Sequence, residues 1–184
     1  MKGILAGVLI TLTMISVGYA YTGFGICNFG KETVTEVICY GPTVLKETKV
    51  TGNVNISGPL KAQDVSLGSM NITGSVDIEA SMVTGPVEVT GAFKAQDVKF
   101  QKDLSLTAHD MLLRHSTVDG SITVHSSTSK PYLKIECGTA INGSVIFSGM
   151  PGVVQITNDS LIRGKLENGE FEFVQKKCPH SSTP

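Results

Sequence analysis

The sequence predicts an all-β protein, a single-domain β-solenoid whose short strands coil into a right- or left-handed parallel β-helix. Residues 50–67 return as residues 83–100, with ten of eighteen positions identical. A shorter phrase, aliphatic-Thr-Gly-x-Val-x-aliphatic, begins at Val50, Ile72 and Val83. Within each copy apolar and polar residues alternate, which is typical of half-buried strands. Self-similarity at a short period indicates stacked units that bury a common core.

The starts of the short phrase are twenty-two and eleven residues apart, so the basic unit has about eleven residues. A turn of the solenoid would then contain two units in roughly 22 residues, or three in roughly 33. Looser copies follow at residues 118–124, 141–147 and 162–166. The glycine in each copy supplies the backbone freedom that a corner needs. Asn-Gly and Asp-Gly pairs also allow hairpins, but repetition at inward positions favours parallel stacking.

The N-terminal residues 1–20 resemble a secretory signal peptide. Lys2 precedes a largely apolar run at residues 3–17, and Gly18 and Ala20 place small residues where a signal peptidase reads. We therefore expect cleavage after Ala20. An uncleaved anchor is the alternative, because apolar residues continue to Ile26 and the total length could span a bilayer. After cleavage no segment could span a membrane as a helix.

The remaining chain divides into three parts. Residues 21–48 lack the glycine-centred phrase, and we expect them to form an N-terminal capping segment that covers the first open sheet edge. Residues 49–168 carry the repeats. Residues 169–184 form a C-terminal strand, in which Phe171 and Phe173 alternate with glutamates, and a polar tail.

Two stretches within the repeats depart from the pattern. Residues 101–115 replace the glycine corner by Lys102-Asp103, and we interpret them as an imperfect rung; a helical turn around Met111 is the alternative. Residues 126–130, before Pro131, are typical of a loop that projects from a corner.

The chain has four cysteines, an even number that suits an oxidising compartment and predicts two disulfides. Three pairings are possible. We expect Cys27 to pair with Cys39 ahead of the repeats, and Cys137 with Cys178, which would tie the tail to the stack. A metal site is disfavoured because the sequence has no Cys-x-x-Cys pair. We expect no cofactor.

Some charged residues recur at equivalent repeat positions. Asp64 matches Asp97, and Lys61 matches Lys94. In a polysaccharide-active enzyme aligned carboxylates could hold calcium and a lysine could act as the base, but a duplicated solvent-facing corner explains these residues better. A denser ionisable cluster comprises His109, Asp110, Arg114 and His115, and it is better explained as solvated side chains than as a metal or anion site.

The charge balance excludes several partners. Fifteen Lys and Arg against sixteen Asp and Glu give a formal net charge of −1, and the sequence contains no basic run. Nucleic acid and anionic membrane surfaces are therefore poor partners. Asn-x-Ser/Thr sequons begin at Asn55, Asn71, Asn142 and Asn158. Most of them fall within or beside the repeat phrase, where such polar residues are common in any case.

The phrases Val-Thr-Gly-Asn-Val-Asn-Ile, Ile-Thr-Gly-Ser-Val-Asp-Ile and Val-Asp-Gly-Ser-Ile-Thr-Val resemble repeats of bactofilins, which are bacterial polymer-forming β-solenoids. They are also similar to putative adhesin repeats with short strands and glycine corners. The resemblance covers residues 49–166. It implies a β-solenoid fold and no catalytic residues. The export signal and the cysteines depart from bactofilins, which are typically cytoplasmic.

These observations lead to three functional hypotheses. The first is a non-enzymatic structural scaffold of a bacterial cell envelope, exported to the periplasm, outer envelope or surface, which contacts itself or other envelope proteins through the solenoid ends. The second is an adhesin or glycan-binding module. Its binding face would comprise Asn55, Ser57, Lys61, Asp64, Lys94 and Asp97. The third, ranked last, is a small polysaccharide-active enzyme.

Overall fold

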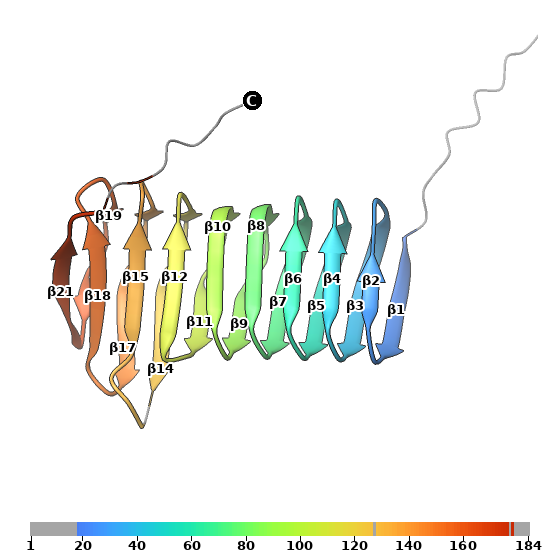
Figure 1. Ribbon diagram of the computed structural model, residues 1–184, viewed down its shortest axis with the longest axis horizontal. Helices are drawn as coiled ribbons and strands as arrows, with labels where there is room; N and C mark the ends of the chain where they lie inside the picture. The colour runs from blue at the N-terminus through green and yellow to red at the C-terminus, as the bar shows by residue number, and fades with distance from the viewer. Residues whose placement is uncertain (1–17, 127, 177, 179–184) are drawn as a thin grey trace, which may run out of the picture.

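The computed structural model describes residues 18–126, 128–176 and 178, which form a parallel β-solenoid of about nine turns (Figure 1). Every strand pairing in the described part is parallel, including those that flank Asp119-Gly120 and Asn142-Gly143, so neither pair makes a hairpin. All the elements are strands, and none of the described residues forms a helix suited to crossing a bilayer. Residues 1–17 of the predicted signal peptide lie outside the described residues. The predicted cleavage point after Ala20 falls inside the first strand.

The strands, in chain order, are β1 (Tyr19–Phe24), β2 (Cys27–Phe29), β3 (Thr33–Tyr40), β4 (Thr43–Lys46), β5 (Lys49–Ser57), β6 (Leu60–Gln63), β7 (Ser66–Thr73), β8 (Val76–Val83), β9 (Val87–Thr90), β10 (Phe93–Phe100), β11 (Leu104–Thr107), β12 (Asp110–Arg114), β13 (Thr117–Val118), β14 (Ile122–Ser126), β15 (Tyr132–Glu136), β16 (Ala140–Ile141), β17 (Val145–Gly149), β18 (Gly152–Thr157), β19 (Leu161–Ile162), β20 (Leu166–Glu167) and β21 (Gly169–Val174).

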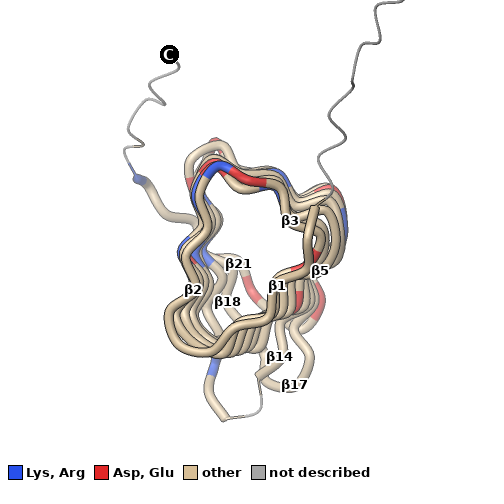
Figure 2. Tube along the Cα trace, turned by 90° about the vertical axis from the view of Figure 1, so that its right-hand side faces the viewer, with Lys and Arg blue, Asp and Glu red and all other residues tan. Residues whose placement is uncertain are grey.

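Hydrogen-bonded strands stack into three faces, and successive turns superimpose along the axis (Figure 2). Face A contains β2, β4, β6, the first halves of β8 and β10, then β12, β15, β18 and β21. Face B contains the first residues of β3, β5 and β7, the last residues of β8 and β10, and then β13, β16 and β19. Face C runs from β1 through the second halves of β3, β5 and β7 to β9, β11, β14, β17 and β20.

The length of a turn differs from the prediction. Lys61 lies beside Asp77, and Asp77 lies beside Lys94 in the next turn, so Lys61 and its repeat equivalent Lys94 are two turns apart. Each of these turns therefore holds about one and a half of the basic sequence units, so the predicted turn of two or three units is wrong for this part of the solenoid. The error arose because glycine corners at two different edges of the same turn carry similar phrases. After β12 the next two turns are longer and reach about the predicted 22 residues, as in the step from Leu112 to Lys134.

Two of the three corners are built on glycines that contact the turn before. Between faces C and A, Gly41, Gly58, Gly74 and Gly91 all have positive φ, and a Cβ on any of them would overlap backbone of the preceding turn. Between faces B and C, Gly164 packs on Gly143 and Gly143 on Gly120, while Gly120 packs on Lys102 and Asp103 of the turn before. The looser copies therefore belong to the solenoid, as predicted. Stacking thus demands glycine through close approach as well as through φ.

The third corner, between faces A and B, uses left-handed residues other than glycine. Glu47, Asp64, Ala80, Asp97, His115 and Cys137 occupy it with φ between 47° and 57°. The backbone turns away from its ladder here, and a hydroxyl of the next turn accepts the free N–H: Val65 N donates to Ser81 Oγ at 3.1 Å and Val98 N to Ser116 Oγ at 3.1 Å. Buried hydroxyls thus satisfy buried donors.

The core is one continuous column of inward side chains, two for each face in each turn. One turn contributes Leu60, Ala62, Val65, Leu67, Met70 and Ile72, all buried. Residues of like position stack, so that Ile56 lies beside Ile72 and Ile72 beside Val89. Burial of this alternating set explains why the strands form, since no turn could bury its apolar side chains alone.

Two disulfides fasten the ends of the described chain. Cys27 is bonded to Cys39 across the first turn, and Cys137 to Cys178, which ties the tail to the corner between faces A and B. Both are the pairings expected from the sequence. Closing such loops stabilises a protein by roughly 2–4 kcal/mol, largely by restricting the unfolded chain.

The segments that departed from the repeat also belong to the stack. Residues 101–115 contain β11 and β12, so the strand interpretation is confirmed and the helical turn around Met111 is wrong. Residues 21–48, expected as a capping segment, contain β2 to β4 and most of β1, which pair in the same parallel manner as later turns. The predicted loop before Pro131 separates β14 from β15.

Candidate functional surfaces: grooves and ends of the solenoid

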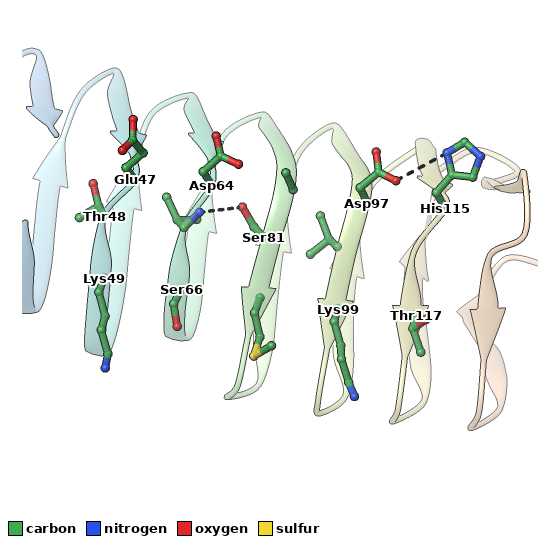
Figure 3. Close-up of a pocket in the computed structure, with 14 residues that line it drawn as sticks. Glu47, Thr48, Lys49, Asp64, Ser66, Ser81, Asp97, Lys99, His115 and Thr117 are labelled. Carbon is green, nitrogen blue, oxygen red and sulfur yellow. Dashed lines mark hydrogen bonds and ion pairs between the residues drawn. The ribbon is translucent and has the colours of Figure 1, made fainter. Parts of the chain in front are cut away.

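A groove with a volume of about 830 Å³ follows the corner between faces A and B. One rim is the left-handed corner column, and the other is the outward column of face B, which includes Lys49 and Lys99 (Figure 3). Its floor contains the buried side chains of Val65, Ser81 and Val98. The groove therefore carries charges of both signs, with carboxylates on one side and two lysines on the other.

Asp64 and Asp97 both lie in this groove, but they do not meet. Ala80 occupies the corner position between them, so the two aspartates are two turns apart, roughly 10 Å at the spacing of neighbouring strands. Calcium ligands lie about 2.3–2.6 Å from the ion, so a shared ion would require both side chains to reach across the turn that carries Ala80. None of the described residues forms a group of three metal-ligating side chains.

The ionisable cluster predicted near His109 is divided among separate partners. His115 Nδ1 lies 3.7 Å from Asp97 Oδ1 (Figure 3). Asp110 Oδ1 lies 3.8 Å from Lys134 Nζ, and the His109 ring packs edge-on against Tyr132. The structure does not bring these side chains together as one site.

A salt-bridged carboxylate that no sequence pattern singled out holds the C-terminal tail. Glu136 is buried, and its Oε2 accepts hydrogen bonds from Arg114 Nη2 at 2.9 Å and Lys176 Nζ at 2.6 Å. Burial alone would raise the pKa of Glu136, but the hydrogen bonds from Lys176 and Arg114 outweigh it and hold the pKa below the ordinary value of 4.5. Both partners are distant in the sequence, so no local pattern could have indicated them.

The residues predicted as one binding face are spread over two faces and a corner. Asn55 and Ser57 lie on face C, whereas Lys61 and Lys94 lie on face A and the two aspartates on the corner. Lys94 Nζ is 3.3 Å from Asp77 Oδ1, an exposed pair of the kind that adds little stability. The set does not form a single surface.

A second groove of about 470 Å³ lies on face C, and Asn55 is part of it. Its floor includes the buried Met70, Val87 and Leu104. Amide, carboxylate, hydroxyl and imidazole side chains line it: Asn53, Asn55, Ser69, Asn71, Glu88, Asp103, Ser105, Thr123 and His125. Donors and acceptors therefore repeat along the groove.

The C-terminal end of the solenoid is open in the described part of the chain. Phe171 lies beside Val154 and Phe173 beside Ile156, so both occupy inward core positions of the last turn. They are nevertheless 46% and 74% exposed, because no described strand follows β21 on that side. This end presents apolar core positions and a free sheet edge.

The N-terminal end is closed differently. Phe29 and Cys27, on the first strand of face A, are buried. The Tyr21 ring packs edge-on against Phe29 with 4.9 Å between centroids, and the Cys27–Cys39 disulfide fills the turn. The alternation of Phe171 and Phe173 with glutamates was visible in the sequence, but the difference between the two ends was not.

These features establish a β-solenoid, and the resemblance to bactofilins is supported only as far as that fold. Comparison of the chain with models of protein families, with curated proteins and with solved structures finds no match.

Proposed function

We propose that this protein is an exported, non-enzymatic scaffold of a bacterial cell envelope that assembles through its C-terminal end. The observation that carries the proposal is the exposure of Phe171 and Phe173 at inward core positions of the last turn. A further strand stacked on β21 would bury both rings and pair the free edge, as β-augmentation does elsewhere. The partner is a second copy or another envelope protein.

Two other features support this proposal. The two disulfides suit an oxidising, extracytoplasmic setting. A salt bridge and a disulfide also hold the last turn in place, because Lys176 binds Glu136 and Cys178 binds Cys137. A fastened edge is better suited to docking than a fraying one, since its ordering cost is already met.

The test is light scattering and negative-stain electron microscopy of the exported protein over a range of concentrations, under oxidising conditions. We expect concentration-dependent oligomers. Head-to-tail contacts would give filaments, and pairing of two C-terminal ends would give discrete dimers. The variant Phe171→Ser/Phe173→Ser should shift the population to monomers, whereas Phe24→Ser, which alters a comparably exposed phenylalanine near the other end, should not.

A protein that stays monomeric at every concentration and captures no envelope component would refute the scaffold. The alternative is a glycan-binding module, favoured by the polar lining of the face C groove. Binding to a glycan array that is lost in Asn55→Ala/Asn71→Ala, with assembly unchanged, would support that alternative. The enzyme hypothesis predicts polysaccharide cleavage that is lost in Asp64→Ala or Asp97→Ala.

A further inference from the structure

The first two turns carry a cluster of exposed apolar side chains on the outside of the solenoid. Phe24 is 82% exposed, Ile26 79%, Tyr40 50% and Val44 37%. The Phe24 and Tyr40 rings stack with 5.0 Å between centroids. These four residues, here called the N-terminal patch, surround the corner at which Gly25 and Gly41 turn the chain from face C to face A.

Stacking of turns does not explain the N-terminal patch, because its side chains point outward. The positions that follow Phe24 and Tyr40 in the same column are Ser57, Thr73 and Thr90. The column that contains Val44 continues with Lys61 and Asp77. Polar residues thus predominate at these columns after the second turn, with the half-buried Leu112 as an exception in the Val44 column, and the exposed apolar side chains of these columns lie at one end. End-to-end assembly would leave them in water, so another surface must cover them.

The chain itself indicates which surface that is. The described residues begin at Gly18, directly before β1 at the blue end of the stack (Figure 1). The largely apolar run at residues 3–17 immediately precedes them, so this end of the solenoid is the one delivered at the bilayer during export. Aromatic and aliphatic side chains favour the interface between lipid headgroups and hydrocarbon. We propose that the N-terminal patch docks on a lipid surface, with the C-terminal end left free.

The composition of the patch fixes the character of the docking. None of its four residues is charged, so attraction to anionic lipids contributes little and binding should change little with salt. Transfer of each large apolar side chain out of water favours binding. Removal of one should therefore weaken vesicle binding about tenfold. This proposal does not depend on end-to-end assembly, because it concerns outward side chains of the other end.

The chain has no tryptophan, so a single introduced one reports on its own surroundings. Phe24→Trp places the reporter in the patch. Thr90→Trp places it in the same column four turns away, roughly 19 Å along the axis, as a matched control. The full chain is produced by export, purified, and mixed with phosphatidylcholine vesicles with and without brominated acyl chains.

We expect the emission of Phe24→Trp to move to shorter wavelength with vesicles and to be quenched by brominated lipid, while that of Thr90→Trp does neither. The partition coefficient onto vesicles, measured by flotation, should fall about a hundredfold in Phe24→Ser/Ile26→Ser, and the circular dichroism spectrum should stay unchanged. Equal emission and quenching for both reporters would overturn the proposal. So would a shift of Phe24→Trp emission that depends on protein concentration without vesicles, since that would identify a second copy as the occupant.

Discussion

Replacing Gly58 by alanine should destabilise the solenoid strongly. Gly58 has a φ of +151°, and a Cβ built there lies 2.5 Å from the oxygen and 2.6 Å from the carbonyl carbon of Gly41, where ordinary contacts are 3.4–4 Å. The backbone conformation costs an L-residue about 1–3 kcal/mol, and separating the two turns costs about 1–3 kcal/mol more. We expect a loss of about 4 kcal/mol, or about 8–16 °C in Tm for a domain of this size.

Two matched substitutions separate the cost of the backbone conformation from the cost of the contact between turns. Gly25→Ala introduces a Cβ at a φ of +83° with no atom within 4 Å, so only the backbone cost of about 1–2 kcal/mol applies. Gly30→Ala meets no atom within 4 Å and has no positive φ, and should change stability by less than about 0.5 kcal/mol. Thermal and urea unfolding followed by circular dichroism rank the three variants by stability. If Gly58→Ala unfolds no more readily than Gly25→Ala, close packing of the corners is not what demands glycine.

The corners, the disulfides and the buried carboxylate each yield a further prediction. Ala80→Gly should raise stability by about 0.5–1 kcal/mol in urea unfolding, because the relief of a left-handed φ of 48° exceeds the added entropy of the unfolded chain; an unchanged midpoint would contradict it. Cys27→Ser/Cys39→Ser should lower the free energy of unfolding by about 3 kcal/mol, and a reducing agent should then have no further effect on the first turn. The pKa of Glu136 is depressed in the folded state, so its contribution is complete above the unfolded value of 4.5 and is lost as the pH falls through the folded pKa. A Tm measured against pH should show this acid loss in the wild type and a smaller one in Glu136→Gln.

The fold class could be predicted because inward positions repeat. Val50 and Val83 occupy the same column, with Leu67 between them, so the stack preserved an aliphatic side chain at each step. The disulfide pairing was also accessible, since Cys27 and Cys39 are close in sequence and the tail cysteine had one remaining partner. The alternation of apolar and polar residues and the pairing of a few cysteines can both be recognised in a single sequence.

The turn length could not be predicted correctly from the sequence. Gly52 and Gly74 lie at different corners of the solenoid, although both belong to similar Thr-Gly phrases. The predicted residues of the binding face do not share one surface for the same reason. Residues close in the repeat, such as Ser57 and Lys61, lie on opposite sides of a glycine corner. Which side chains share a surface depends on where the corners fall. Repeat spacing alone does not determine that.

The return of the long phrase after two complete turns has a consequence for how such a chain can change in length. Removing residues 50–82 would join Lys49 to Val83, which occupies the same column as Val50, and every later side chain would keep its inward or outward direction. A tandem duplication of the coding sequence for this stretch would lengthen the rod by roughly 10 Å. Neither end would be altered, because both disulfides lie outside the stretch. Proteins that evolved by duplication of whole turns would therefore share the same two ends and differ in the length of the rod.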